Sequence, residues 1–347
     1  MERYCINKSR SVADALVRLN RLHAVSMTLF VLDDDGTMLG TVTDGDIRRA
    51  LIAGVPLSAS VAEAMHSDFS YLSDRKDIAS LKLLRERQIT LIPLLDPKRR
   101  LVDIFDLTKR RSALPVDAVL MAGGKGERLR PLTLTLPKPL LPMGEKAIID
   151  HNIDRLAHFG IQNISTTVNY LKELIIEHFK EPMACGVKVD CISEDRFLGT
   201  IGSLKLVREF KNDTILVMNS DLLTDIDYED FYLHFQRHEA TMSAAAIPYT
   251  IAVPYGIFDV EGREIKGVTE KPTYNLYANA GIYLIKKSAL EYIPEGETFN
   301  ATDLIDALVA DGQRVVRYPL SGLWIDIGTP TEYNKAKELI KHLGKIS

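Results

Sequence analysis

The stretch from residue 119 to residue 142, VLMAGGKGERLRPLTLTLPKPLLP, constrains the fold most, because an apolar run leads directly into a glycine-rich turn. Residues 116–121 predict a buried strand. Gly123, Gly124 and Gly126 follow it, and without Cβ atoms their backbone N–H groups can approach an anion closely. Four cations lie in the same stretch: Lys125, Arg128, Arg130 and Lys138. The sequence therefore predicts a phosphate-binding turn at the end of a strand.

Two common phosphate motifs do not fit this turn. A dinucleotide-binding turn reads G-x-G-x-x-G, but the third glycine position holds Leu129, and no Gly-Lys-Ser/Thr follows as in a P-loop. The turn instead reads G-G-x-G-x-R-L-x-P-L-T, with P-K-P after it. This pattern resembles the signature of the sugar-1-phosphate nucleotidyltransferases. Glu127 stands where many members have Thr, and we expect its carboxylate to point away from phosphate or to serve a helix N-terminus.

Length and composition limit the classes of function. A chain of 347 residues is long for one domain and natural for two. Its formal charge of −4 gives no basic excess for binding nucleic acid. Cys5, Cys185 and Cys191 have no metal-ligand spacing, so we expect three small buried hydrophobic side chains and a reducing compartment. No run of 18 apolar residues and no signal peptide is seen, so we expect a cytoplasmic protein without a membrane partner.

Before residue 113 the chain runs twice through one pattern of helix, apolar strand ending in Asp, turn, and second strand leading into a short helix. Residues 11–22 and 78–88 are the expected helices, followed by MTLFVLDDDG with GTVTDGDIRRAL and by TLIPLLDPKRR with LVDIFDLTK. The weak similarity predicts an internal duplication. The pattern resembles a CBS domain, which usually occurs in pairs. We therefore expect a regulatory tandem CBS pair over residues 1–112, split at about 55/56, and a transferase domain over residues 113–347.

The first copy contains a candidate ligand site. In CBS domains the signature Ser/Thr-x-x-Asp places an acid at a ribose hydroxyl of an adenosine nucleotide, and Thr43 with Asp46 matches it. In the second copy, Asp103 and Asp106 put an acid in place of the Ser/Thr, so we expect one ligand site at most. Two alternatives stay open: a docking or dimerisation module without a ligand, and a turn or helix-cap role for Asp44 and Asp46.

After residue 113, strands and helices alternate as in α/β proteins. The resemblance implies a Rossmann-like, glycosyltransferase-A-like mixed sheet. The expected strands are 116–121, 163–168, 187–192 and 214–218, and the expected helices are 151–159, 171–179 and 203–210. Such sheets bind ligands outside the carboxyl ends of their strands, where the glycine turn, Asn169, Glu194 and Asp221 all fall.

Two aspartates are candidate metal ligands. Asp221 ends the apolar run ILVMNSD, and Asp326 lies in LWIDIGTP. Two carboxylates with phosphate oxygens and water suit Mg²⁺. In the resembled family Asp221 occupies the place of a Mg²⁺ ligand, although Ser220 replaces the usual glycine before it. By the same resemblance, Arg128 would hold the β- and γ-phosphates of a nucleoside triphosphate, and Lys138 would hold the α-phosphate.

The resemblance also assigns binding residues. The nucleotide would contact Ala122, Gly123, Gly124, Gly126, Asn169, Gly199 and Thr200. The sugar phosphate would contact Gly256, Glu270, Lys271, Asn279 and Gly281, with Glu194 near the sugar. Ile201 replaces an alanine of the family beside the expected nucleotide site, which we expect to alter the fit there.

The expected reaction joins a sugar 1-phosphate to a nucleoside triphosphate and releases pyrophosphate. The CBS pair ahead of the transferase looks most like glucosamine-1-phosphate guanylyltransferases of nonulosonic acid synthesis, and mannose- and heptose-1-phosphate guanylyltransferases share the catalytic residues. We expect GTP, with dTTP, UTP and CTP left open. Regulation by an adenosine nucleotide and a homo-oligomer are further expectations. The alternative is a non-catalytic sensor of nucleotide sugars.

Overall fold

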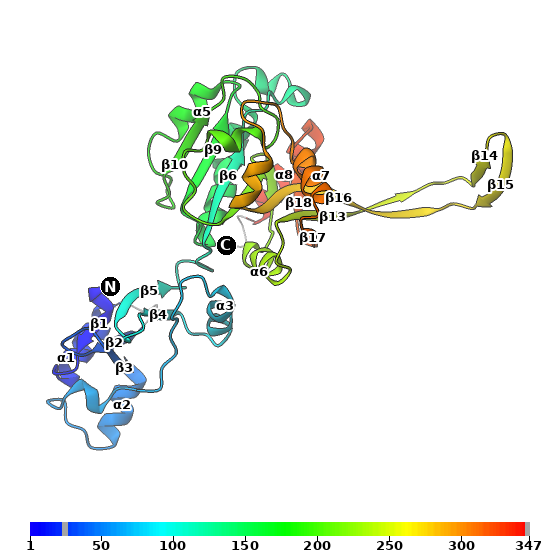
Figure 1. Ribbon diagram of the computed structural model, residues 1–347. Coiled ribbons are helices and arrows are strands. Elements are labelled where there is room, and N and C mark those ends of the chain that lie inside the picture. Colours follow the sequence, from blue (N-terminus) through cyan, green and yellow to red (C-terminus); the bar gives the residue numbers. More distant parts are fainter. Residues whose placement is uncertain (23–26, 344–347) are drawn as a thin grey trace. The chain divides into compact units, whose positions relative to one another are not determined.

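A computed structural model describes residues 1–22 and 27–343 as two compact units (Figure 1). The N-terminal unit comprises residues 1–115 and 158–160, and the second unit comprises the other described residues. In these ranges no helix is both long and apolar enough to cross a lipid bilayer; helix α8 (Pro330–Leu343) has 14 residues, against about 20 that a crossing needs.

The N-terminal unit repeats a helix followed by a strand hairpin, but the short helix expected after the second strand forms in the first copy as α2 and is replaced by a turn at residues 107–109 in the second. Its elements are β1 (Cys5–Asn7), α1 (Val12–Arg21), β2 (Thr28–Leu32), β3 (Met38–Thr43), α2 (Asp44–Ile52), α3 (Ile78–Glu86), β4 (Leu91–Leu95) and β5 (Leu101–Asp106). β2 pairs antiparallel with β3, β4 pairs antiparallel with β5, and each hairpin has a register shift at the same place. Each position of the second hairpin lies 63 residues after its counterpart, as Leu91 does after Thr28 and Asp106 after Thr43.

This register corrects the alignment of the two copies. Asp106 occupies the place of Thr43, whereas Asp103 falls at the place of Gly40. The sequence comparison matched the spacing of acids, but equivalence in a hairpin is set by strand pairing and by the bulge. The Thr-x-x-Asp of the first copy therefore corresponds to Asp106-x-x-Lys109 in the second.

The second unit is built on a seven-stranded mixed sheet within the described residues, in the order β10-β9-β6-β11-β16-β13-β17. Its elements in chain order, besides α8, are β6 (Val116–Met121), β7 (Pro142–Met143), β8 (Lys146–Ala147), α4 (Ile148–His158), β9 (Ile164–Val168), α5 (Lys172–His178), β10 (Val189–Ser193), β11 (Thr214–Asn219), β12 (Leu222–Thr224), α6 (Tyr228–Arg237), β13 (Met242–Ala252), β14 (Ile257–Glu261), β15 (Glu264–Thr269), β16 (Thr273–Lys286), α7 (Ala301–Ala310), β17 (Val315–Pro319) and β18 (Trp324–Asp326). β10, β9, β6 and β11 run parallel, whereas β16 is antiparallel to β11 and to β13. The α/β class with a mixed sheet is confirmed, and the four expected strands lie within two residues of their predicted bounds.

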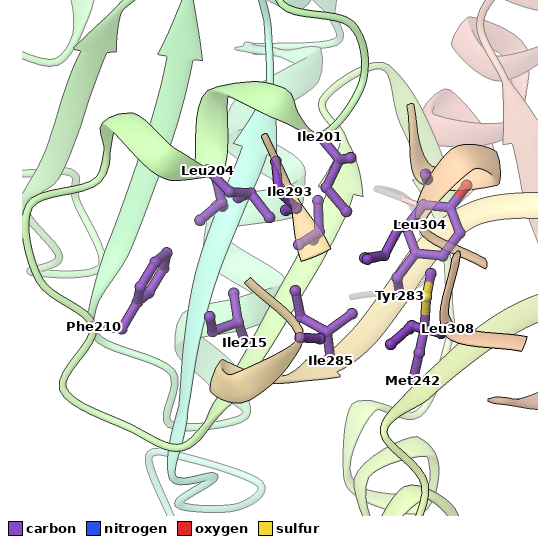
Figure 2. Packing of buried hydrophobic residues seen from close by; sticks show 14 residues of the cluster. Ile201, Leu204, Phe210, Ile215, Met242, Tyr283, Ile285, Ile293, Leu304 and Leu308 are labelled. Carbon is purple, nitrogen blue, oxygen red and sulfur yellow. The ribbon is translucent and has the colours of Figure 1, made fainter. Parts of the chain in front are cut away.

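Helices cover both faces of this sheet. Strands β6 and β11 are buried at almost every position, as strands covered on both faces must be. On one face, Val119 and Val217 pack in a cluster with Leu304 of α7 (Figure 2). On the other face, the buried Tyr228 hydroxyl of α6 contacts the Met218 sulfur at 3.4 Å.

The helix expected at residues 203–210 is instead a short 3-10 helix at Gly202–Leu206. Ile201, Leu204, Val207 and Phe210 all pack in the same cluster, and Figure 2 shows three of them along the segment. These residues are spaced by three. A 3-10 turn has about three residues, so it keeps this row on one side, whereas an α-helix of 3.6 residues per turn does not.

The cysteine prediction was wrong in part. Cys185 is exposed, and Cys5 and Cys191 are half-buried. Cys185 lies in a tight turn closed by hydrogen bonds between Met183 and Val187 and between Gly186 and Met183. Turns run over the surface because their backbone groups need water, so a small apolar residue there is not drawn into the core.

The pairing of His178 with Asp150 predicts a pH-dependent contribution to stability. His178 Nε2 lies 2.7 Å from Asp150 Oδ1, and this bond raises the pKa of His178 above its ordinary value of 6.5. Because the folded pKa is the higher one, the stabilisation is present below about pH 6.5 and is lost as the pH rises through the folded pKa. We expect His178→Gln to cost about 0.5 to 1 kcal/mol at pH 5.5 and less at pH 8.5. Chemical unfolding at both pH values measures this, and equal losses would contradict it.

Candidate functional site

A cavity of about 330 Å³ lies at the carboxyl ends of β6 and β11. The strands run parallel with Met121 opposite Asn219, so the segments that follow them emerge at the same edge of the sheet. Its lining residues are Met121, Ala122, Gly124, Gly126, Glu127, Arg128, Lys138, Pro139, Ser220, Asp221 and Gly328. The structure thus brings together three of the predicted catalytic side chains, with the fourth, Asp326, beside them.

The glycine turn has the backbone that its sequence predicts. Gly126 has φ +60°, a left-handed conformation, and a Cβ there would lie 3.0 Å from Thr133 and 3.1 Å from Lys138. The Thr133 hydroxyl donates to the Gly126 carbonyl at 2.8 Å. Gly124 faces open space, because a Cβ at this position would have no neighbouring atom within 4 Å. The turn is therefore held from behind and leaves its cavity side to a ligand.

Gly328 makes room for Arg128. A Cβ at Gly328 would lie 2.9 Å from the Nη2 atom of Arg128. Both residues line the cavity, although they are 200 positions apart in the chain. The absence of a side chain at Gly328, two residues after Asp326, thus decides where the Arg128 guanidinium can lie. A guanidinium suits the bidentate binding of phosphate.

Lys138 lies between the two predicted metal ligands. Its Nζ forms an ion pair with Asp221 Oδ2 and lies 3.8 Å from Asp326 Oδ1. The two aspartates meet because β12 and β18 pair antiparallel, with Leu222 opposite Asp326. Burial, with the neighbouring Asp221 charge, raises the pKa of Asp326, and the nearby Lys138 and Arg128 cations oppose this.

These carboxylates fit a divalent metal. Asp221 Oδ1 is buried and has no hydrogen-bond partner, and a cation already lies against Oδ2. Across residues 1–22 and 27–343, no three His, Cys, Asp or Glu side chains gather to hold an ion. The protein would therefore supply two carboxylates at most, which suits a metal that keeps water and phosphate oxygens as its other ligands.

Glu127 lines the cavity, whereas Arg130 does not. Glu127 begins a 3-10 helix (Glu127–Leu129), where a carboxylate is favourable, and it pairs with Arg130 at 3.5 Å. Its side chain makes no capping hydrogen bond at this helix, and it also lines the cavity. Arg130 is half exposed and is absent from the cavity lining, so it is not one of the phosphate-binding cations that the sequence suggested.

Asn169 and Glu194 support the glycine turn from the neighbouring strands. A Cβ at Gly123 would lie 3.1 Å from Glu194 Oε1 and 3.4 Å from the Asn169 Cβ. Asn169 Nδ2 donates to the Glu194 carbonyl at 3.1 Å, and Glu194 Oε2 accepts the Leu198 N–H at 3.1 Å. Glu194 is 2% exposed, and burial raises its pKa. The sequence correctly placed Asn169 and Glu194 at the edge of the sheet where the parallel strands end. Glu194, which was expected near the sugar, packs against the glycine turn.

Gly199 and Thr200 pack against the residues at the N-terminal end of α7. Gly199 has φ +80°, and a Cβ there would meet the Phe299 carbonyl at 2.6 Å. The Thr200 hydroxyl accepts the Ala301 N–H at 2.9 Å. Ile201, which follows Thr200, is fully buried in the core cluster (Figure 2), so its side chain packs in the core.

The predicted sugar-phosphate residues fall into two groups. Gly281 has φ +70°, and a Cβ there would lie 2.6 Å from Asn219 Nδ2, two residues before Asp221; Asn279 Oδ1 accepts the Gly281 N–H at 3.0 Å. Gly256, Glu270 and Lys271 instead lie on the long hairpin that β13 to β16 form outside the sheet (Figure 1). Glu270 and Lys271 are exposed, and Lys271 has an unusual φ of +44°.

Sequence reasoning missed Asn152. This residue of α4 is 3% exposed, and its Nδ2 donates to the carbonyls of Ser220 at 3.3 Å and Leu222 at 2.9 Å. It thereby holds the backbone on both sides of Asp221. An amide among the apolar positions of a helix was the available signal, since buried polar groups need partners.

Thr43 and Asp46 form a capping box at the start of α2. The Asp46 N–H donates to Thr43 Oγ1 at 3.2 Å, and Asp46 Oδ2 accepts the Thr43 N–H at 2.8 Å. The other Asp46 oxygen pairs with Arg49. The helix-cap alternative for Asp46 thus describes this structure, and any ligand role must compete with these bonds.

Comparisons with known proteins match this division. A family model described as "Nucleotidyl transferase" matches residues 117–342, and one described as "CBS domain" matches residues 2–53. The chain is 32% identical over 226 residues to the mannose-1-phosphate guanylyltransferase of Mycobacterium tuberculosis, covering 63% of this chain and 62% of that protein. It is 31% identical over 224 residues to the mannose-1-phosphate guanylyltransferase catalytic subunit beta of Dictyostelium discoideum, with 62% of each chain covered.

The chain thus spans less than two thirds of the length of these relatives. Among solved structures, HddC from Yersinia pseudotuberculosis is similar at 26% identity with a TM-score of 0.52. That match covers 65% of this chain and 99% of HddC, so the fold of the second unit is that of HddC.

The contact between Gly328 and Arg128 predicts a specific effect of one methyl group. We expect Gly328→Ala to weaken triphosphate binding about tenfold, because the added methyl group would displace the Arg128 guanidinium. The backbone should not be strained, since the φ of Gly328 is one that alanine adopts. Titration of a labelled nucleoside triphosphate measures this. In an Arg128→Ala background the same substitution should have no further effect, and an unchanged loss there would show that it acts elsewhere.

Proposed function

The chain belongs to the nucleotidyl transferase family, and we propose that it transfers a nucleoside monophosphate from a triphosphate to a sugar 1-phosphate, with release of pyrophosphate. The observation that carries this proposal is the cavity in which the glycine turn, Arg128 and Lys138 face two carboxylates. Three kinds of group for phosphate are thus present: backbone N–H groups, a guanidinium and an ammonium beside acids.

The proposed reaction needs no covalent intermediate on the protein. A phosphate oxygen of the sugar 1-phosphate attacks the α-phosphorus, a new P–O bond forms, and the bond to the bridging oxygen of pyrophosphate breaks. Arg128 binds the β- and γ-phosphates of the leaving group, and the Gly124 and Gly126 turn receives the same anion. Catalysis is then the positioning of reactants and the stabilisation of charge.

Lys138 has a further role because of its ion pairs. In this structure its ammonium pairs with Asp221 and lies near Asp326, so it offsets part of the repulsion between these two acids. When a triphosphate binds, Lys138 moves to the α-phosphate and the carboxylates become free for a cation. Divalent metals are common in nucleotidyltransferases of this family. We propose Mg²⁺ held by Asp221 and Asp326, which would supply positive charge to the phosphates.

We propose GTP as the nucleotide and mannose or glucosamine 1-phosphate as the acceptor. The support is the similarity to mannose-1-phosphate guanylyltransferases at 31% and 32% identity. Asn279 and Gly281 are proposed to hold the sugar, because Gly281 packs against Asn219, two residues before Asp221, and Asn279 bonds to Gly281. Glu270 and Lys271 are proposed for the sugar phosphate.

A pyrophosphate-release assay tests this proposal. We expect release with Mg²⁺, GTP and one of these two sugar phosphates, and a rate at least about a hundredfold lower for Asp221→Asn. Parallel reactions with dTTP, UTP and CTP, and with other hexose 1-phosphates, define the base and the sugar. No release from any pair, by protein that still binds nucleotide, would overturn catalysis and favour a sensor of nucleotide sugars.

For the N-terminal unit we propose a CBS pair that binds an adenosine nucleotide at Thr43 and Asp46. The equal strand register of the two hairpins supports residues 56–112 as the second member. Binding requires Asp46 to exchange its bond to Arg49 for a ribose hydroxyl.

Calorimetry with ATP, ADP and AMP tests the site. We expect Asp46→Ala to abolish binding of the nucleotide that the wild-type protein binds. Asp44→Ala is the matched control, because Asp44 lies on the same helix and forms an ion pair with the exposed Arg48. Unchanged binding in Asp46→Ala, or no binding by the wild-type protein, would disprove the site.

A further inference from the structure

The hairpin that carries Glu270 and Lys271 has no neighbouring strand within the described chain. We define the arm as residues 247–278. Pairing of β13 with β17 ends at Ala246, and pairing of β16 with β11 ends at Ile282, so along the arm each strand has only the other strand as a partner. Figure 1 shows the arm extending away from the sheet, with β14 and β15 at its far end. A two-stranded ribbon alone is marginally stable in water.

The arm is amphipathic along its length. In its first part, Tyr249 lies opposite Leu276 and Ile251 opposite Tyr274, all on one face. The alternate positions are more polar and hold Thr250, Thr273 and Asn275 beside Pro248, Ala252 and Tyr277, with the Thr250 hydroxyl bonded to Asn275 at 3.1 Å. Such alternation is typical of an antiparallel sheet that packs against something on one side only.

The tip has the same construction. Phe258 lies opposite Val268 and Val260 opposite Ile265, so these four side chains share a face. Each part of the arm thus has an apolar face, and the eight side chains of these two faces are each between 41% and 61% exposed: Tyr249, Ile251, Phe258, Val260, Ile265, Val268, Tyr274 and Leu276. Since about half of the surface of each of these side chains is exposed, together they expose on the order of 800 Å² per arm. Each partner in a standard protein interface buries about this area.

While the arm is extended, the sheet domain of the same chain cannot cover its apolar side chains, because the arm is longer than that domain is wide. From Ala246 to Glu261 it reaches about 50 Å at the usual rise per residue. A core of this size has a diameter of about 40 Å. A two-fold pair solves the problem for both copies at once, because each arm then lies on the core of the other.

The core offers a matching surface beside the cavity. Leu132 and Leu134, which follow the glycine turn, are 45% and 53% exposed, and Leu174 of α5 is 41% exposed. The Tyr170 hydroxyl bonds the carbonyls of Thr133 and Leu134, which places the start of α5 next to that turn. An apolar rim thus borders the cavity on the side of the glycine turn.

We propose that the arm docks on a second copy of this chain and delivers Glu270 and Lys271 to the cavity of that copy. These residues lie between the two parts of the arm, with the β14–β15 tip on one side and the Tyr249–Leu276 ribbon on the other. The sugar-phosphate part of each site is then completed by its partner. The role of Glu270 and Lys271 rests on the proposed function, whereas the docking of the arm does not.

The first experiment measures oligomeric state by light scattering across a range of concentrations. We expect a wild-type dimer, and we expect Ile251→Lys to shift it to monomer by at least about tenfold in dissociation constant. Thr250→Lys is the matched control, since it puts the same charge on the polar face one residue away. Both positions are exposed, so circular dichroism should show both variants folded. A monomeric wild-type protein, or equal behaviour of the two variants, would overturn the docking.

The second experiment mixes two inactive variants. Lys138→Ala damages the cavity and keeps the arm, whereas Lys271→Ala damages the arm and keeps the cavity. After co-expression, the mixture of dimers should recover up to about a quarter of the wild-type rate, because about half of the dimers are mixed and each of these has one working site of two. A mixture as inactive as its parents would show that the arm serves its own cavity. If the wild-type chain transferred no nucleotide, the proposed function would fail while light scattering still decides the docking.

Discussion

The parallel pairing of β6 with β11 is the constraint on which the site depends. Its register sets Met121 opposite Asn219, so the glycine turn and Asp221 leave the sheet side by side although about 100 residues separate them. The buried Ser220 hydroxyl donates to the Met121 carbonyl at 2.7 Å, and Asn152 holds the backbone on either side of Asp221. A slip in this register would move the acid away from the phosphate turn and would turn buried side chains outward.

Charge compensation is the second organising feature. Asp221 and Asp326 are brought together by the β12–β18 pair, and Lys138 offsets part of their charge. A buried pair of like charges is costly without such a partner. These three side chains therefore compensate one another's charge when no ligand is bound. A triphosphate with a cation can then replace the internal ion pairs.

The arm contrasts with this rigid site. The central strands β6 and β11 are buried on both faces, while the arm has two free edges and its two apolar faces expose eight large side chains. Exposed edges and apolar faces are what proteins avoid unless another surface covers them. Docking on a second copy would cover the face and would also bring Glu270 and Lys271 to a cavity, linking assembly to the sugar side of the site.

The sequence by itself determined the α/β class, the strand bounds, the repeat before residue 113 and the residue types of the phosphate turn, because apolar periodicity and glycine spacing are local signals. It also placed Arg128, Lys138, Asp221 and Asp326 in one site by pattern. Only the tertiary structure decided that Lys138 pairs with both acids, that Gly328 makes room for Arg128, that Asn152 supports Asp221, that Ile201 enters the core and that Glu270 and Lys271 lie on an extended arm. These depend on strand pairing between distant segments, and no local pattern encodes which segments will meet.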